Sequence, residues 1–449
     1  MSRLLIRGGR LVDPSTRNDE RTDILIVDGI VAERGTELEP GEGTRVVEAD
    51  GMVVCPGLVD MHVHLREPGR EDEETILSGS RAAAHGGITA VAAMPNTEPA
   101  IDTASWVSFV REHESPISVY PIAAVTRGRK GETLTEMAEL AEAGAVAFSD
   151  DGSPVSSAST MRRALEYSSM VGRPIISHCE SLELTGTGVM NEGFASTLAG
   201  LRPAPAAAED VAVARDLILA GMTGAKLHIA HVSTRGAVEL VRRAKDDGVA
   251  VTCETCPHYF TLTDDDAGTF DTNMRVNPPL RSAADVAAVK EGLADGTIDA
   301  IASDHAPHAL EEKQVEFDAA APGMIGLETP LPLTLTQLVQ PGTITLERAI
   351  ELMSTDPATI LGIPHGSLEV GSPADVTVFD PEWSWQVERD WFRSRSRNSP
   401  FVGRRVKGRV VLTVSRGEVV FEETHLGGGD AHEEREREPG QLAHNLQRS

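Results

Sequence analysis

The chain has 449 residues and a formal net charge of −28, with 69 acidic against 41 basic residues. This balance argues against nucleic acid or an anionic membrane as a partner, because both carry negative charge. No apolar run approaches the length of a membrane span, and the N-terminus lacks the apolar core of a signal peptide, so we expect a cytoplasmic protein.

Arginine supplies most of the basic residues, and lysine is scarce. An acidic surface with few lysines is typical of proteins from salt-accumulating halophiles. The alternative is an ordinary acidic soluble protein. We favour the halophilic interpretation, since high salt screens the self-repulsion that such a charge creates.

The two ends of the chain have a similar texture. Residues 1–54 contain short alternating apolar segments punctuated by Gly, Asp and Pro, which predict part of a small antiparallel β unit. The same pattern returns in residues 365–425, so we expect the ends to pair into one discontinuous β domain. Residues 426–449 are Gly-rich and then charged, which predicts a disordered acidic tail.

Between these ends, residues 55–364 alternate apolar strands with alanine-rich helices, which indicates an α/β fold. The alternation favours a (β/α)₈ TIM-like barrel over a doubly wound sheet, whose Gly-rich phosphate fingerprints are missing. The predicted strands span Val53–Leu65, Ile88–Met94, Ser118–Val125, Ala145–Ser149, Pro174–His178, Lys226–His231, Val249–Glu254 and Ile298–Ser303. The predicted helices include Leu134–Ala143, Met161–Ser169, Ala206–Leu219, Ala237–Asp246 and Ala283–Leu293.

Four cysteines in a long chain without a signal peptide do not suggest a disulfide framework. Cys253 and Cys256, with His258 nearby, could form half of a zinc site. No second Cys-x-x-Cys pair exists, and on a strand this spacing places the two sulfurs on opposite faces. We therefore expect buried thiols at Cys55, Cys179, Cys253 and Cys256.

Metal-ligand residues gather at the carboxyl ends of the predicted strands, which is where barrel active sites lie. His62 and His64 are two residues apart, so both imidazoles project to the same side of their strand. Later strands end in Asp150-Asp151, His178, His231 and Asp304. This convergence predicts a metal site.

Four histidines and two aspartates exceed the needs of one tetrahedral zinc and suit two metals that share a bridging carboxylate. Two such metals would activate a water and polarise a carbonyl, which makes an amide hydrolase plausible. A carboxylate after the last strand could then transfer the proton from the water to the leaving nitrogen.

The opening motif, Asp60-Met61-His62-Val63-His64 followed by Arg66, Pro68 and Gly69, resembles that of the amidohydrolase superfamily. The whole motif set is similar to dihydroorotases of the larger, class I type, over roughly residues 1–425. The other motifs are Met94–Thr97, Asp150–Gly152, Asn277–Arg281, Asp304–His308 and Gly326–Thr329.

The resemblance implies two zinc ions per subunit. His62, His64 and Asp304 would hold the first ion, and His178 and His231 the second. Asp151 would bridge both ions, and Asp304 would also act as the general base and acid. Many amidohydrolases use a carboxylated lysine as the bridge; here the fourth strand offers Asp150 and Asp151, and we choose Asp151 from its place before Gly152.

The resemblance also implies a set of substrate contacts. Arg66 and Asn96 would bind a substrate carboxylate, with His64 beside them. Asn277 and His308 would contact the dihydropyrimidine ring or its opened form, and the backbone at Pro322 and Gly323 would contact the ring amides. The family often has an aromatic residue where this chain has Pro322.

The expected activity is the reversible cyclisation of N-carbamoyl-L-aspartate to (S)-dihydroorotate in pyrimidine (UMP) biosynthesis. The alternatives are a related cyclic amidase, such as an allantoinase or hydantoinase, and a non-catalytic partner of aspartate carbamoyltransferase. Inactive relatives typically lose metal ligands, whereas all six positions here are filled. We expect a homo-oligomer that acts on a small molecule, and aspartate carbamoyltransferase is an expected partner.

The charge of −28 generates a first prediction. The melting temperature should rise with KCl well beyond physiological ionic strength, because salt screens the repulsion between acidic groups. Thermal unfolding followed from dilute buffer to molar KCl measures this. A flat or falling melting temperature would contradict the halophilic interpretation.

Overall fold

Eight parallel strands form the central sheet of the computed structural model, which describes residues 2–423. The sheet nearly closes into a barrel, as predicted. At the closing seam, Val63 and His305 form an isolated parallel β-bridge, and the His64 N–H donates to the His305 carbonyl at 2.9 Å. In order around it lie β6 (Leu58–Val63), β7 (Ile88–Ala93), β8 (Ser118–Ala123), β9 (Ala147–Phe148), β10 (Ile175–Ser177), β13 (Leu227–Ile229), β14 (Val251–Thr255) and β15 (Ala300–Ile301).

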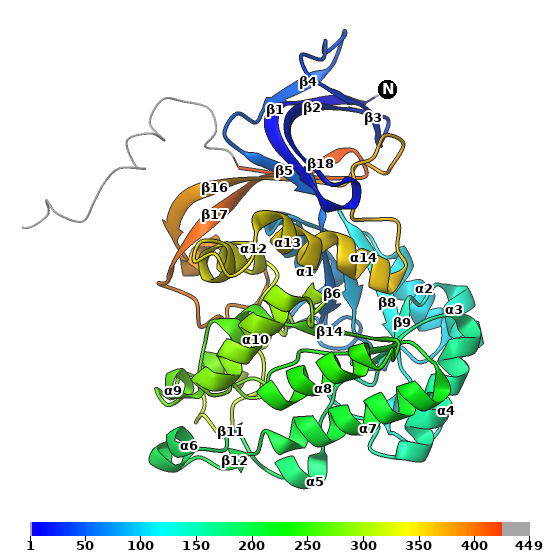
Figure 1. Ribbon diagram of the computed structural model, residues 1–449, viewed down its shortest axis with the longest axis vertical. Helices are drawn as coiled ribbons and strands as arrows, with labels where there is room; N and C mark the ends of the chain where they lie inside the picture. Colours follow the sequence, from blue (N-terminus) through cyan, green and yellow to red (C-terminus); the bar gives the residue numbers. More distant parts are fainter. Residues whose placement is uncertain (1, 424–449) are drawn as a thin grey trace, which may run out of the picture.

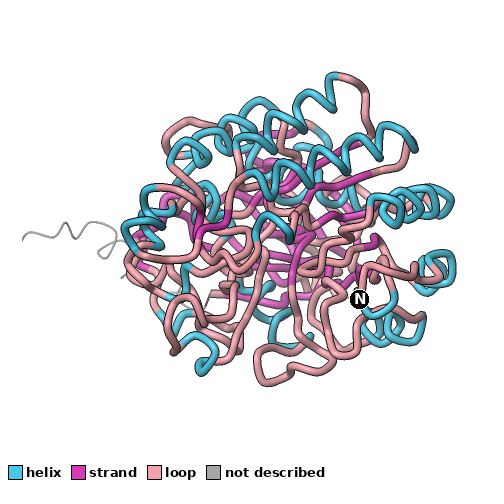
Figure 2. Tube along the Cα trace, turned by 90° about the horizontal axis from the view of Figure 1, so that it is seen from below, coloured by secondary structure: helices cyan, strands magenta, loops and turns pink. Residues whose placement is uncertain are grey.

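Helices follow the strands and cover the outside of the barrel, while the strands run through the middle of the molecule (Figure 2). Within residues 2–423, no helix is long and apolar enough to span a membrane. The main helices are α1 (Ile76–His85), α2 (Ala104–Glu112), α3 (Met137–Ala143), α4 (Ala158–Val171), α7 (Ala207–Thr223), α8 (Arg235–Asp246), α10 (Ala283–Asp295), α12 (Pro330–Thr334), α13 (Leu346–Ile350) and α14 (Asp356–Leu361). Shorter helices lie in the loops: α5 (Leu182–Thr185), α6 (Phe194–Ala199), α9 (Asp264–Ala267) and α11 (Leu310–Lys313).

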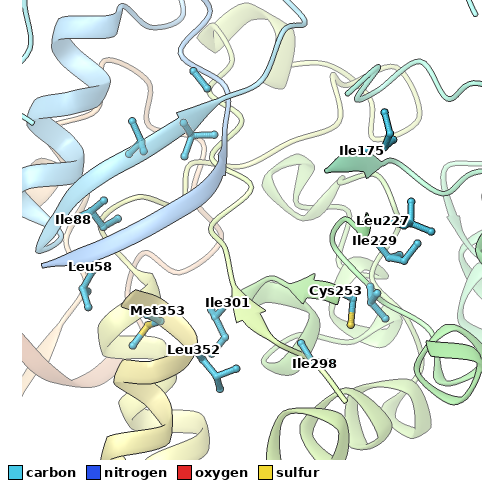
Figure 3. Packing of buried hydrophobic residues seen from close by; sticks show 14 of the residues in the cluster. Leu58, Ile88, Ile175, Leu227, Ile229, Cys253, Ile298, Ile301, Leu352 and Met353 are labelled. Carbon is cyan, nitrogen blue, oxygen red and sulfur yellow. The ribbon is translucent and has the colours of Figure 1, made fainter. Parts of the chain in front are cut away.

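The barrel strands have two apolar faces because their side chains alternate. One face packs against the helices; Figure 3 shows Leu58, Ile88 and Ile301 near Leu352 and Met353, which belong to the π-helical turn Glu351–Thr355. The other face fills the barrel with apolar residues, many of which are alanines. Its members include Val59, Met61, Ala90, Ala92, Ile122, Ala147, Ile176, Ala230, Ala300 and Ala302.

A separate eight-stranded sheet contains strands from both ends of the chain, as predicted (Figure 1). β5 (Val53–Pro56) pairs antiparallel with β16 (Val376–Gln386) and so joins the two ends. The expectation of a purely antiparallel unit is wrong, because β1 (Arg3–Asp13) pairs in parallel with both β4 (Arg45–Glu48) and β5. The sheet is completed by β2 (Asn18–Val27), β3 (Ile30–Gly35), β17 (Arg405–Ser415) and β18 (Glu418–Glu422).

The single strand predicted over 53–65 is in fact two strands in two sheets. β5 ends at Pro56, and β6 begins at Leu58 in the barrel. Gly57 connects the two strands. A Cβ atom at this position would lie 2.1 Å from Thr89 Oγ1, so only glycine fits without a shift. The domain limits at residues 54 and 365 remain a prediction. The predicted tail, residues 426–449, lies outside the described residues.

The packing between strands and helices generates a second prediction. Phe148 on β9 is fully buried, so Phe148→Ala should lower the free energy of unfolding by about 3–5 kcal/mol. The matched control is Phe194→Ala on α6, where the ring is 81% exposed and the change should stay within about 0.5 kcal/mol. Urea unfolding measures both variants, and equal losses would contradict this description of the core.

Candidate metal centre and active site

Six buried ligand-type side chains converge at the carboxyl ends of the barrel strands. Two lie on or just after β6, and the others follow β9, β10, β13 and β15. They are the residues singled out from the sequence: His62, His64, Asp151, His178, His231 and Asp304.

Asp151 lies at the centre of this group. Its Oδ1 is 3.5 Å from His62 Nε2 and from His178 Nδ1, and 3.6 Å from His231 Nε2. These separations exceed the usual length of a hydrogen bond, and both Asp151 Oδ1 and His62 Nε2 are buried without a hydrogen-bond partner. Buried polar atoms rarely lack a partner, so the donor set fits divalent cations between the carboxylate and the rings.

The ligand atoms fall into two overlapping groups. His62, His64 and Asp304 offer atoms within 4.8 Å of one another, as do His62, Asp151 and His231. His64 Nε2 lies 3.1 Å from Asp304 Oδ1, whereas His178 Nδ1 lies 2.8 Å from His231 Nε2. Two ring nitrogens that face each other so closely are arranged to share a proton or a cation. The residues present therefore suit two metal positions.

In three of the histidines, the ring nitrogen that faces away from the site lies next to a hydrogen-bond acceptor, which orients the ring. His62 Nδ1 lies 2.6 Å from Glu254 Oε1, His64 Nδ1 lies 2.8 Å from Asn96 Oδ1, and His178 Nε2 lies 3.0 Å from Glu180 Oε2. When each outer nitrogen donates to its acceptor, the inner nitrogen keeps its lone pair toward the site. This arrangement is typical of metal-ligating histidines.

The neighbouring aspartates have different surroundings. Asp150 accepts hydrogen bonds from the Thr126 N–H, at 3.0 Å, and from the Thr126 hydroxyl, so its carboxylate is occupied by the loop after β8. Asp151 points among the histidines instead. This contrast supports Asp151 over Asp150 for the bridging position.

Electrostatics keep the two central carboxylates ionised. Burial by itself raises the pKa of Asp151, but the nearby rings of His62, His178 and His231 outweigh burial and hold this pKa well below its usual range. Burial by itself also raises the pKa of Asp304, but the close imidazoles of His64 and His62 outweigh burial and lower this pKa. Two adjacent carboxylates that stay charged form an attractive site for cations.

Three residues of the candidate site adopt left-handed backbone conformations that residues other than glycine seldom adopt. They are Arg66 (φ 61°), His231 (φ 37°) and Asp304 (φ 47°). Such conformations cost free energy, and they cluster at functional sites because they aim a side chain that regular backbone would direct elsewhere.

Arg66 and His308 lie together at the edge of the metal-ligand group. Arg66 Nε lies 3.0 Å from Glu73 Oε2 and 3.1 Å from the Pro307 carbonyl. Both contacts use Nε, so the Nη1 amino group is left for a carboxylate, while Nη2 also lies near His308. His308 Nε2 lies 3.5 Å from Arg66 Nη2 and 3.0 Å from the Pro322 carbonyl.

The remaining predicted substrate contacts have partners within the chain. The Asn277 amide donates to Glu180 Oε2 at 3.0 Å, which places it beside His178. The Gly323 N–H donates to the Arg275 carbonyl at 2.8 Å, and the Gly323 carbonyl accepts from Lys313 Nζ at 2.9 Å. A backbone contact between substrate and Gly323 would therefore have to replace or share these hydrogen bonds. Asn96 has a role beyond the predicted one, since it orients His64.

Several polar residues around the site were not singled out from the sequence. Glu254 on β14 orients His62 across 192 residues of chain, and no local pattern marks it. Glu73 joins Arg66 to His308, and it too has no sequence signal. Glu180 follows His178 by two residues and could have been inferred from that spacing.

The four cysteines are free and buried, as expected. Cys253 and Cys256 do not form a site together. Cys256, His258 and Asp304 nevertheless offer ligand-type atoms within 4.8 Å of one another.

Comparisons with known proteins agree with this geometry. A dihydro-orotase-like family model matches residues 51–237, and an amidohydrolase family model matches residues 204–421. The dihydroorotase of Geobacter sp. (strain M21) is 56% identical over 422 residues, which cover 93% of this chain and 99% of the relative. The dihydroorotase of Acetivibrio thermocellus is 52% identical over 426 residues, which cover 94% and 100%.

Solved structures share the architecture. The L-hydantoinase (dihydropyrimidinase) from Arthrobacter aurescens matches with a TM-score of 0.85 at 30% identity, over 94% of this chain and 96% of that one. The dihydropyrimidinase from Brevibacillus agri matches at 0.81 and 24% identity, over 94% and 95%, which shows the fold alone.

The barrel, the converging ligands and these matches define the chain as an amidohydrolase. Within that class, it belongs to the dihydroorotase family.

The different surroundings of the two aspartates generate a third prediction. Loss of a residue that only hydrogen-bonds to a metal ligand typically lowers metal affinity by roughly 10–100-fold. Asp151→Asn should weaken divalent-metal binding by more than this, because Asp151 would be a ligand itself. Asp150→Asn should keep the metal and lower thermal stability, because the hydrogen bonds with Thr126 weaken. Metal analysis and thermal unfolding of both variants measure this. Metal loss confined to Asp150→Asn would reverse the assignment.

Proposed function

We propose that this chain is a zinc-dependent dihydroorotase, which cyclises N-carbamoyl-L-aspartate reversibly to (S)-dihydroorotate and water in pyrimidine biosynthesis. The observation that carries the proposal is the convergence of four imidazoles on the buried, unpartnered Oδ1 of Asp151 and on Asp304, with Arg66 alongside. The chain belongs to the dihydroorotase family, and this membership supports the assignment of this reaction to the site.

His62, His64 and Asp304 would hold one zinc ion and His178 with His231 the other, with Asp151 shared between them. When bound, these ions supply a polarised carbonyl and a water of lowered pKa. The side chains of Glu254, Asn96 and Glu180 hold the rings of His62, His64 and His178 in position. The same acceptors set which nitrogen of each ring faces inward.

Asp304 would transfer the proton. Its lowered pKa keeps the carboxylate ionised near neutral pH, so an oxygen can accept a proton from the attacking water during hydrolysis. The same oxygen then delivers that proton to the departing ring nitrogen as the amide C–N bond breaks. In the synthetic direction the order reverses, and net uptake of a proton favours cyclisation at lower pH.

Arg66 and Asn96 would recognise the carboxylate that remains free in both substrate and product. The planar guanidinium suits a carboxylate, and the Asn96 amide nitrogen can donate while its oxygen orients His64. His308 and Asn277 would contact the ring or its opened form, beside the backbone at Pro322 and Gly323.

The second candidate is a hydantoinase-type cyclic amidase, which the 30%-identical L-hydantoinase structure favours. The relatives named dihydroorotase are much closer in sequence, at 52–56% identity. The deciding experiment offers zinc-loaded protein dihydroorotate, allantoin and a hydantoin in high salt. Turnover of a hydantoin in preference to dihydroorotate would overturn the proposal.

We also propose a homo-oligomer. Val211, Ile218 and Met222 lie seven and four residues apart on α7, so they share one helix face, and each is more than half exposed. An apolar stripe of this kind suits burial against another subunit. Association with aspartate carbamoyltransferase and a cytoplasmic location stay predictions.

The role of Asp304 generates a fourth prediction. Asp304→Asn keeps the shape and a ligating oxygen but cannot carry the proton, so turnover should fall by about 10²–10⁴-fold in both directions. Much of the bound metal should remain. Turnover and metal content are measured on one preparation. Near-normal turnover with metal bound would remove Asp304 as the proton carrier and direct attention to His308.

A further inference from the structure

A pocket of about 470 Å³ lies beside the candidate site and shares His308 with it. Its basic lining side chains are Arg389, Arg395, Arg397 and Lys313. The acidic lining side chains are Asp72 and Glu311, and Asp72 is already paired with Arg70 at 3.6 Å. We call this hollow the arginine pocket. Its size is in the ordinary range for small-molecule sites.

The arginines of this pocket have no carboxylate partner, although the chain is acidic. Across residues 2–423, about half of the arginines pair with carboxylates, whereas Arg389, Arg395 and Arg397 form no ion pair. Arg389 and Arg395 are exposed. Arg397 Nη1 donates to the carbonyls of Ser394 and Ser396, so the guanidinium groups of Arg389 and Arg395 are the ones available for an external anion.

The chain that carries the arginines is built to hold them in place. From Arg393 to Asn398 the burial alternates, with the arginines outward and the polar residues between them inward. Ser394 Oγ donates to Glu74 Oε2 at 2.5 Å, and Ser396 Oγ donates to the Glu73 carbonyl at 2.8 Å. The inward contacts fix the backbone, which directs the arginines toward the pocket and solvent.

The same contacts tie the arginine pocket to the residues that would bind substrate. Glu73, whose carbonyl accepts from Ser396, has Oε2 at 3.0 Å from Arg66 Nε and Oε1 at 3.2 Å from His308 Nδ1. Asn398 donates to the carbonyls of Ala306, at 3.0 Å, and Gly323, at 3.2 Å. The pocket wall and the substrate-contact residues therefore form one continuous hydrogen-bonded structure.

We propose that the arginine pocket is an anion-binding vestibule that takes up the acyclic dicarboxylate before it reaches the metal centre. The inference rests on the proposed function and adds a site to it. N-carbamoyl-aspartate carries two carboxylates and dihydroorotate carries one. A cationic vestibule on an otherwise repulsive surface raises the local concentration of the dianion more than that of the monoanion.

The test is steady-state kinetics in both directions on the double variant Arg389→Gln with Arg395→Gln. The Michaelis constant for N-carbamoyl-aspartate should rise roughly tenfold and that for dihydroorotate clearly less, with kcat nearly unchanged in both directions. In the unaltered protein, kcat/KM for the dianion should fall as KCl rises, and the variant should show a shallower dependence.

The matched control is Arg163→Gln with Arg243→Gln, which removes the same charge from exposed arginines on α4 and α8 without an ion pair in the described chain. Both Michaelis constants should stay within about twofold of the unaltered protein. The variant Arg389→Lys with Arg395→Lys should have a Michaelis constant for N-carbamoyl-aspartate close to that of the unaltered protein, because it keeps the positive charge.

Unchanged Michaelis constants in the Gln double variant would overturn the inference, and so would equal rises for both substrates. An effect of the same size in the control would overturn it as well, because net charge alone would then explain it. If the unaltered, zinc-loaded protein turns over neither compound, the proposed function fails and the vestibule fails with it. If the double variant unfolds, the single variant Arg395→Gln carries the same test.

Discussion

A buried carboxylate among four imidazoles is the constraint on which the rest of this structure depends. Asp151 is removed from water, and no group within hydrogen-bonding distance satisfies its Oδ1. A buried charge is tolerated only with nearby compensation, and here His62 on β6 and the histidines that follow β10 and β13 surround it. The barrel supplies that meeting point, because its parallel strands all end on the same face.

The barrel can hold such a polar centre because the surrounding structure fixes each ring. Glu254 comes from β14, and its own pKa is lowered to about 2, since the nearby rings of His62 and His228 outweigh burial. Asp60 accepts from the Ser303 N–H at 3.1 Å and so ties β6 to the segment that carries Asp304. The closing seam of the barrel and the metal-ligand group are thus stabilised by the same few residues.

Much of this was predictable from the sequence, and the failures have physical causes. Strand periodicity and His-x-His spacing were enough to place His62, His64, His178, His231 and Asp304 at one end of a barrel, because parallel strands align their ends. The spacing could not separate Asp150 from Asp151, since the difference lies in Thr126 on another loop. The partners Glu254 and Glu73 come from distant parts of the chain and leave no local signal. The apolar run over 53–65 concealed a change of sheet at Gly57, where the close approach of Thr89 requires a glycine.

Asp151 has one further consequence for how the protein matures. A carboxylated lysine acquires its carboxyl group from dissolved carbon dioxide after translation, and it can lose that group again when the metal leaves. Asp151 carries its carboxylate as soon as the chain is synthesised. Apoprotein of this chain therefore needs no bicarbonate to regain its central carboxylate.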